Sequence, residues 1–303
     1  MKENRKKLVW AIIILLCCFN FLSWKTVYEL NKQGLLRVVF FDIGQGDSIF
    51  IETPEKYQIL IDGGPNTNVL EKLAKNMLPC DRTIDLVVLT HPDHDHIYGL
   101  IDVLGRYKVK NILWTGVIKD TSEYEKWENL IEKEKAKIFI ANSEKEIVFP
   151  RVVLRILNPI ESIEGEKLKK VNNTSIVIKL IFDDKTFLFT GDIFKSIERE
   201  LVERYGEKID SDVLKVAHHG SKTSSDEKFL ETVSPEIAVI SVEGNTEIKG
   251  EKCDNKERNR YGHPGCATLS ELKKLKVEMF RTDEDGDISI VSDGKNLKIE
   301  TKK

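Results

Sequence analysis

The segment from Thr90 to His96 constrains the fold of this chain more than any other, because it places three histidines and two aspartates within six residues. Imidazole and carboxylate groups packed this closely are difficult to satisfy without a cation. The segment directly follows an apolar run, residues 86–90, that is typical of a buried strand. The alternative is an acidic, solvated loop in which histidines gather by chance. We therefore expect a metal site where a strand ends, the place at which α/β sheets position their sites.

The other histidines support the same interpretation. The chain has six histidines in total, and they fall in three short clusters. His218 and His219 follow a predicted strand at residues 213–216, and His263 precedes a predicted helix at residues 267–275. Histidines scattered through a core would not gather in this way. We expect the fold to bring the three clusters to one site.

Short strand-like runs and helical periodicities alternate in two similar halves of the chain. The first half predicts strands at residues 36–43, 47–53, 57–61, 86–90 and 111–114, and helices at 69–77 and 97–107. The second half predicts strands at 152–157, 175–182, 186–190, 213–216 and near Ile288 and Leu297, and helices at 193–205, after Ser224 and at 267–275. Two mixed sheets, each covered by helices on its outer face, account for this order. Two charge-rich stretches, 161–170 and 247–260, are predicted to be surface loops.

The N-terminal segment has the pattern of a membrane anchor. Four basic residues precede residues 8–24, which carry no charge; the basic residues are Lys2, Arg5, Lys6 and Lys7. We favour an uncleaved anchor that leaves the rest of the chain outside the cytoplasmic membrane, with a cleaved secretory signal as the alternative. The predicted organisation is an anchor and linker at residues 1–35 and one domain at residues 36–303.

Composition narrows the classes of function. The chain has 303 residues, with 47 basic and 50 acidic side chains and a net charge of −3. That balance excludes a broad basic surface, so nucleic acid would have to be held by something other than lysine and arginine alone. The five cysteines are odd in number and show no C-x-x-C spacing, which argues against a disulfide scaffold and a cysteine zinc site.

Six motifs in order resemble a known family. The run from His91 to His96 resembles the H-x-H-x-D-H motif of the metallo-β-lactamase superfamily, with Asp93 in place of the second histidine. The chain is more closely similar to the hydrolase domain at the end of the ComEC competence proteins. The matching stretches are VFFDIGQGDS at 39–48, LIDGG at 60–64, NNTS at 172–175, TGDI at 190–193, LKVAHHGS at 214–221 and NRYGHP at 259–264. The resemblance implies an α/β fold, a four-layer αββα metallo-β-lactamase sandwich preceded by one transmembrane helix or signal.

The resemblance also implies a metal-ligand set for two divalent ions, zinc or manganese. It assigns His91 and Asp93 to one ion, Asp95 and His96 to the other, and Asp192 as the carboxylate that bridges them. His218 would complete the second site. Two ions bridged in this way lie about 3.5 to 4 Å apart in phosphoesterases. Where the superfamily often supplies a third histidine to the first metal, this sequence offers Asn172, Asn173 and Ser175.

Further residues are expected around the metals. Asp62 resembles the acid that orients a ligand histidine, although a turn aspartate before two glycines is an equal alternative. His219 is expected to contact phosphate or transfer protons, unless it rather than His218 is the ligand. His263 is the candidate general acid, and a loop histidine is its alternative. The expected catalytic residues are thus His263, His219 and Asp62, and the expected substrate-binding residues are Asn173, Ser175, Ser221 and Tyr261. His94 occupies a non-ligand position in the motif.

These expectations lead to a function. We predict a hydrolase in which two metals activate a hydroxide, most readily a phosphodiesterase or nuclease that acts outside the cytoplasmic membrane and is linked to DNA uptake. Its partners would be a phosphoester substrate, with single-stranded DNA as one candidate, and the membrane; no feature requires an obligate protein partner. The alternatives are a phosphocholine-type surface phosphoesterase, or a catalytically impaired module that binds a ligand through its metals. A secreted protein is the alternative location.

Overall fold

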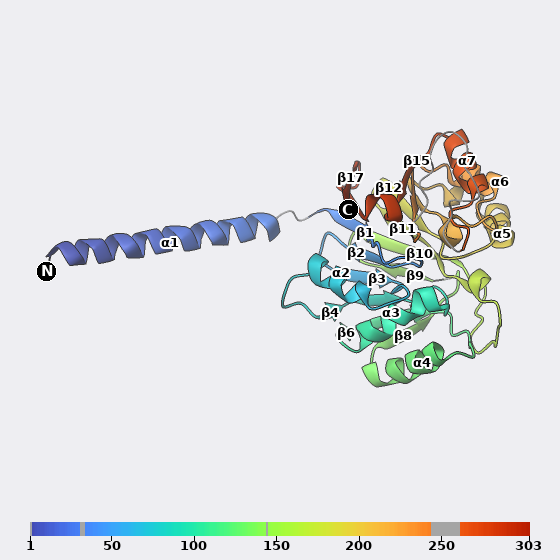
Figure 1. The fold of residues 1–303 in the computed structure, drawn as a ribbon, viewed down its shortest axis with the longest axis horizontal. Coiled ribbons are helices and arrows are strands. Elements are labelled where there is room, and N and C mark those ends of the chain that lie inside the picture. The colour runs from blue at the N-terminus through green and yellow to red at the C-terminus, as the bar shows by residue number, and fades with distance from the viewer. Residues whose placement is uncertain (1, 31–33, 144, 244–260) are drawn as a thin grey trace. The chain divides into compact units, whose positions relative to one another are not determined.

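A computed structural model describes residues 2–30, 34–143, 145–243 and 261–303 in two compact units, Met1–Leu35 and Leu36–Lys303 (Figure 1). The first unit contains the long helix α1 (Lys2–Leu30). Within it, Arg5–Trp24 is 20 residues long with a mean hydropathy of 2.0, which is long and apolar enough to cross a membrane. A signal sequence has the same length and composition, so this helix is a candidate span. The predicted loop at 247–260 lies outside the described residues.

The first large sheet of the second unit has eight strands in the order β17-β16-β1-β2-β3-β5-β7-β8. Their bounds are β1 (Leu36–Phe40), β2 (Ile49–Glu52), β3 (Gln58–Ile61), β5 (Leu86–Val88), β7 (Asn111–Trp114), β8 (Lys137–Ile140), β16 (Asp287–Ser292) and β17 (Leu297–Lys302). Strands β3, β5, β7 and β8 are parallel to one another, whereas the pairs on the other side are antiparallel. The loops after β3 and β5 therefore leave the sheet at the same edge. These loops carry Asp62 and His91.

The second large sheet has seven strands in the order β15-β14-β13-β12-β11-β10-β9. Their bounds are β9 (Glu146–Val148), β10 (Val152–Asn158), β11 (Val177–Phe182), β12 (Lys185–Phe189), β13 (Val213–Lys215), β14 (Ile237–Ile240) and β15 (Glu278–Arg281). Strands β12 to β15 are parallel, so the segments after β12, β13 and β14 also meet at one edge. A short third sheet pairs β4 (Thr83–Ile84) with β6 (Lys108–Val109).

The two large sheets pack face to face, and helices cover their outer faces. Alternate residues of β1 show why: Val38 and Phe40 join the core between the sheets, whereas Val39 joins the core under the helices. The rings of Phe40 and Phe189 lie 6.2 Å apart across the interface between the sheets. Helices α2 (Asn68–Asn76), α3 (His94–Leu104) and α4 (Ser122–Glu134) cover the first sheet. Helices α5 (Lys195–Tyr205), α6 (Glu227–Val233) and α7 (Cys266–Lys274) cover the second (Figure 1).

This arrangement confirms the predicted four-layer αββα sandwich, but the sequence patterns missed several elements. Helix α4 and strands β8, β9, β14 and β15 were not predicted. Helix α4 is rich in charge, and its buried face consists of Tyr124, Trp127 and Ile131. Helix α3 starts at His94, earlier than the apolar periodicity indicates, so the histidine-rich segment spans a strand end and a helix start.

Candidate metal centre

The histidine-rich segment places its side chains on both sides of a sharp change in backbone direction. Strand β5 ends at Val88, the chain bends at Thr90, and Asp93, in extended backbone, is the N-cap of α3. Asp95 and His96 then lie in the first turn of the helix. His91 and His96 consequently meet with ring centroids 4.1 Å apart, although five positions separate them in the chain.

Four side chains from both halves of the domain form one group that fits a metal ion. The potential ligand atoms of Asp95, His96, Asp192 and His219 all lie within 4.8 Å of one another. Asp192 Oδ2 lies 3.4 Å from His96 Nε2 and 3.3 Å from His219 Nε2, and Asp95 Oδ2 lies 3.4 Å from His219 Nε2. Two carboxylates and two imidazoles are a suitable donor set for zinc or manganese.

Three imidazole nitrogens at this group are buried and have no hydrogen-bond partner among the described residues. They are His96 Nε2, His219 Nε2 and Nε2 of the adjacent His91, whose ring lies 4.1 Å from that of His96. Buried polar atoms are ordinarily satisfied, because an unpaired one costs about 1–3 kcal/mol. Three such nitrogens beside the Asp192 carboxylate are the feature that a bound divalent cation would explain.

The opposite nitrogen of each buried histidine is hydrogen-bonded, and this sets the tautomer. His96 Nδ1 lies 2.8 Å from Asp62 Oδ2 and His219 Nδ1 lies 2.9 Å from the Ser241 carbonyl oxygen. Both acceptors lack a proton, so each Nδ1 donates and each Nε2 is left to face the metal volume. Asp62 itself accepts from the backbone nitrogen and hydroxyl of Thr90, at 2.8 and 2.7 Å. Asp62 is therefore placed to orient a ligand histidine, the role that the resemblance implies for it.

His91 is held from behind in the same manner. Its Nδ1 lies 3.0 Å from Thr90 Oγ1 and 3.2 Å from Ser175 Oγ, and its Nε2 lies 3.6 Å from Asp93 Oδ2. Ser175 is fully buried, and its hydroxyl also bonds Asn172 and the Asp192 backbone nitrogen. Because these contacts turn Ser175 away from solvent, it is placed to orient His91 and Asp192 rather than to bind substrate, which corrects our expectation.

His218 and His219 point in different directions because both have left-handed backbone conformations. Their φ angles are 50° and 52°, a conformation that is uncommon for residues other than glycine. The side chain of His219 is 1% exposed and joins the metal-ligand group, whereas that of His218 is 20% exposed and its Nε2 is 4.0 Å from Asp192 Oδ2. His218 Nδ1 bonds Thr223 Oγ1 at 3.0 Å, and its ring stacks on Phe194. Of the two alternatives left open by the sequence, this geometry favours His219 as the ligand.

The remaining expected residues divide into two groups. Tyr261 and His263 approach the site: the His263 ring is 5.4 Å from that of His218 and 6.5 Å from that of Tyr261. Asn173 and Ser221 do not line the described pocket. Asn173 bonds the Phe194 backbone and Ser196, and Ser221 is buried against Thr223. Their polar groups bond within the protein, and their substrate-binding roles stay predictions.

A buried charged pair behind the centre was missed by the sequence analysis. Lys215 at the end of β13 is fully buried and pairs with Asp47, and its Nζ lies 3.7 Å from Asp192 Oδ1. Asp47 lies 3.6 Å from His219 Nδ1. Both residues belong to motifs that matched the family, DIGQGDS and LKVAHHGS, and that placement was the signal available. The charges of Lys215 and Asp47 neutralise each other, and Lys215 also supports Asp192 from behind.

The charges of the group shift its pKa values in opposite directions. Burial alone would lower the pKa of His219, but Asp192 and its neighbours raise it to about 9, and the same competition raises the pKa of His96 well above its usual value. Burial would raise the pKa of Asp192, but the two imidazoles hold it well below its usual value. These groups therefore form ion pairs, and metal binding would release the imidazole protons. Burial, followed by the charges of His219 and His218, lowers the pKa of His263 to about 4.

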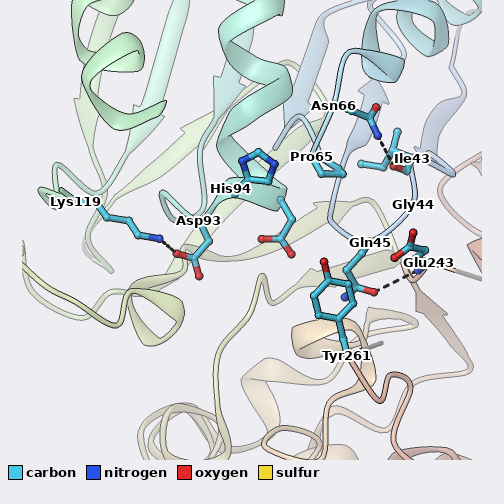
Figure 2. A pocket seen from close by; sticks show the side chains of 11 residues that line it. Ile43, Gly44, Gln45, Pro65, Asn66, Asp93, His94, Lys119, Glu243 and Tyr261 are labelled. Atoms are coloured by element: carbon cyan, nitrogen blue, oxygen red, sulfur yellow. Dashed lines mark hydrogen bonds and ion pairs between the residues drawn. The ribbon is translucent and has the colours of Figure 1, made fainter. Parts of the chain in front are cut away.

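A pocket of about 590 Å³ opens beside the centre (Figure 2). Its lining residues come from the loops after β1, β3, β7 and β14, the start of α3 and the segment before α7. They are Ile43, Gly44, Gln45, Pro65, Asn66, Asp93, His94, Asp95, Lys119, Glu243 and Tyr261. Asp93 and Asp95 join the pocket to the metal-ligand group. The pocket is large enough for a nucleotide-sized group.

Comparisons with known proteins agree with the fold. The family model described as "Metallo-beta-lactamase superfamily" matches residues 41–244. The chain is 29% identical over 276 residues to "ComE operon protein 3" of Bacillus subtilis, covering 86% of this chain and 33% of that protein. It is 26% identical over 283 residues to "Competence protein ComA" of Neisseria gonorrhoeae, covering 91% of this chain and 34% of that protein. The chain thus spans about a third of the length of these curated relatives.

A solved structure shows the same fold. The metallo-beta-lactamase fold protein YhfI from Bacillus subtilis is 13% identical, and the match covers 83% of this chain and 98% of that chain with a TM-score of 0.52. The family model covers well over half of the chain, and the His/Asp group has the donors that such a fold uses. This chain is a metal-binding hydrolase of the metallo-beta-lactamase superfamily.

Proposed function

We propose that this protein is a two-metal phosphodiesterase or nuclease. The observation that carries the proposal is the cluster of unpartnered buried nitrogens of His91, His96 and His219 around Asp192 Oδ2, beside an open pocket. When bound, two divalent ions would activate water and neutralise charge on a phosphoryl group. The similarity to competence proteins adds support for a nucleic-acid substrate.

The proposal assigns a role to each residue of the site. His96, His219 and Asp95 would hold one ion, His91 and Asp93 would hold the other, and Asp192 would serve both. Asp62, Ser175 and Lys215 position these groups from behind. His218, partly exposed beside Asp192, is assigned to the substrate phosphate or to proton transfer. This assignment exchanges the roles first expected for His218 and His219.

The proposal includes a location on the outer side of the cytoplasmic membrane. Basic residues precede the candidate span Arg5–Trp24, which favours a cytoplasmic N-terminus. Cys266 is disulfide-bonded, and disulfides persist in oxidising compartments. Fusions of alkaline phosphatase and of a fluorescent cytoplasmic reporter to the C-terminus test the orientation. An active phosphatase fusion and a non-fluorescent reporter fusion support an outer location of the domain. An inactive phosphatase and a fluorescent reporter contradict it.

The experiment that tests the activity uses the full chain loaded with zinc or with manganese. Substrates are a single-stranded oligonucleotide, bis(p-nitrophenyl) phosphate, p-nitrophenyl phosphocholine and a chromogenic β-lactam. We expect cleavage of the first two, with Asp192→Ala losing bound metal and activity and His94→Ala retaining its metal. His94 is the matched control because its exposed ring lies beside Glu123 and Tyr98. Hydrolysis of p-nitrophenyl phosphocholine alone would favour a phosphocholine-type surface phosphoesterase. Metal binding without turnover of any substrate would favour a module that only binds a ligand.

A further inference from the structure

Three carboxylates and one lysine line the pocket beside the candidate metal centre. Asp93, Asp95 and Glu243 line it, and Lys119 is the one lysine or arginine among the described residues that do so. Lys119 reaches Asp93 with its ammonium group, and Figure 2 shows this ion pair at the left of the view, across the pocket from Glu243. The lysine is therefore attached to a candidate metal ligand and exposed to whatever enters the pocket. Its side chain is 20% exposed.

The backbone that carries Lys119 is held in place by a distant loop. Ile118 donates to the Glu166 carbonyl at 2.8 Å and accepts from Leu168 at 3.3 Å, so residues 116–118 pair with residues 165–168 like a short parallel ladder. Gly116 has a φ of +74°, and an added Cβ would lie 2.9 Å from Glu164 Cγ. The charge-rich loop at 161–170 thus supports the segment that presents Lys119. A side chain on such a backbone has a defined position at the pocket.

A count of formal charges indicates what Lys119 would do once metals are bound. The carboxylates Asp62, Asp93, Asp95 and Asp192 together offset the charge of two divalent ions. Asp47 and Lys215 offset each other. When Asp93 shares its charge with a metal, the ammonium of Lys119 loses part of its partner and becomes available to an anion on its side of the pocket; Glu243 is the remaining charged group of the lining.

From this placement we infer that Lys119 is a substrate-binding residue that holds a non-bridging oxygen of the phosphoester while Asp93 holds metal. The inference rests on the proposed function and deepens it, because it gives the active site a preference for anionic substrates. An ammonium on a long stem binds a phosphate oxygen as a point charge through up to three N–H donors. Because metal binding to Asp93 frees the ammonium group of Lys119, the protein would bind substrate more tightly when metal is present.

The test compares three variants of the full chain in detergent, loaded with manganese. Lys119→Met removes the charge, Lys119→Arg keeps it, and Lys167→Met is the control. Lys167 lies in the supporting loop, and its exposed side chain pairs with Asp120 away from the pocket lining. Three quantities are measured: bound metal, the Kd of inorganic phosphate by calorimetry, and KM and kcat for bis(p-nitrophenyl) phosphate and for a single-stranded oligonucleotide.

We expect Lys119→Met to retain its metal but to weaken phosphate binding and raise KM by about tenfold to a hundredfold, the range of one charge-assisted hydrogen bond. The defect should be smaller in high salt, because salt screens the charge in the unaltered protein. Lys119→Arg should stay within about threefold of the unaltered protein, and Lys167→Met should be unchanged. These two variants show whether phosphate binding depends on the charge at position 119 or on the total surface charge.

Two results would overturn the inference. If phosphate binding and KM are unaltered in Lys119→Met, the lysine does not contact substrate. If Lys119→Met loses metal and the loss accounts for the fall in phosphate binding, Lys119 positions Asp93 instead. Failure of the proposed function has a different outcome: the unaltered protein would cleave no phosphoester, while the Kd of phosphate would still report on Lys119.

Discussion

His218 and His219 are neighbours in the chain, but their backbone conformation gives them separate environments. His219 is buried between Asp95 and Asp192, with its Nδ1 on the Ser241 carbonyl, whereas His218 lies in the partly open space beside Phe194. A buried imidazole with one nitrogen fixed by a carbonyl is the usual arrangement of a metal ligand. His218, which is partly exposed, remains available to a substrate.

This difference predicts opposite effects for the two alanine variants. We expect His219→Ala to lose roughly 10- to 100-fold or more in metal affinity, because it removes a ligand from the centre. His218→Ala should keep its metal and lose mainly turnover, by about 10²-fold or more if it transfers a proton. Metal analysis after dialysis against a weak chelator, combined with kcat, separates the two. The reverse pattern would return the ligand role to His218.

His263 presents a different question, because a general acid must carry a proton to donate. Burial and the neighbouring His219 and His218 lower its pKa to about 4, and bound cations would lower it further, so the ring is neutral at pH 7. This favours a hydrogen-bonding or proton-accepting role over the expected acid. The contact of the Gly265 backbone with the Gly220 carbonyl, at 2.7 Å, holds the His263 segment against the loop of His218 and His219.

We therefore expect His263→Ala to lower kcat about 5- to 30-fold, as for one lost hydrogen bond, and by similar factors on substrates with good and poor leaving groups. The measurement compares bis(p-nitrophenyl) phosphate with a dialkyl or nucleotide phosphodiester at saturating concentration. Metal content is determined in parallel. A loss of 10² to 10⁴ confined to the poor leaving group would show that His263 is the acid after all.

At the scale of elements, helix α5 and the start of α6 are joined by a buried carboxylate. Glu198 on α5 is fully buried and accepts from the backbone nitrogens of Ser225 and Asp226, at 2.8 and 2.7 Å. Asp226 is the N-cap of α6, where its side chain accepts a hydrogen bond from the backbone nitrogen of Lys228. Glu198 therefore positions the segment that leads from the His218 loop into α6.

Replacing Glu198 with alanine should lower the free energy of unfolding by about 2–4 kcal/mol. The change leaves two buried N–H groups without an acceptor and removes the packing of the side chain. Glu200→Ala is the matched control, because Glu200 is an exposed residue of the same helix and its loss should cost no more than about 0.5 kcal/mol. Chemical unfolding of both variants provides the comparison. Equal stability of the two would mean that solvent replaces the Glu198 contacts at no cost.

For the whole domain, the metal centre joins elements that belong to different sheets. His91, Asp95 and His96 follow β5 of the first sheet, whereas Asp192 and His219 follow β12 and β13 of the second. A cation bound to both sets links the two halves and stabilises the folded state by mass action. Metal binding and the cohesion of the sandwich are therefore coupled.

This coupling should depend on pH in a defined direction. The pKa of His219 is raised to about 9 and that of His96 is also raised, so the metal-free protein holds these protons at pH 7 and must release them when metal binds. Manganese affinity should therefore increase with pH until about 9, up to tenfold per unit for each proton released. Calorimetry in buffers of different ionisation enthalpy measures the protons. Affinity that is independent of pH between 6.5 and 8.5 would contradict the assignment.

Local patterns in the sequence were sufficient for the fold class and indicated where a metal site would lie. The order of strand-like runs and helical periodicities predicted two covered sheets, because burial follows the period of each element. The His/Asp run predicted a cation because so many ionisable groups cannot be buried without one. Strands β8, β9 and β15 escaped detection because charged residues interrupt their short apolar runs, whereas the apolar run of β14 was overlooked.

Contacts between segments far apart in the chain settled the rest. The left-handed backbone at His218 and His219 determines which ring is buried, and no spacing rule reports a backbone angle. Ser175 is turned toward His91 by contacts with Asn172 and Asp192, and Lys119 reaches the pocket because the loop at 161–170 supports its segment. A sequence pattern records the chemistry that each residue brings. The direction in which a side chain points depends on the packing of the whole sandwich. That packing decides which side chains face the pocket.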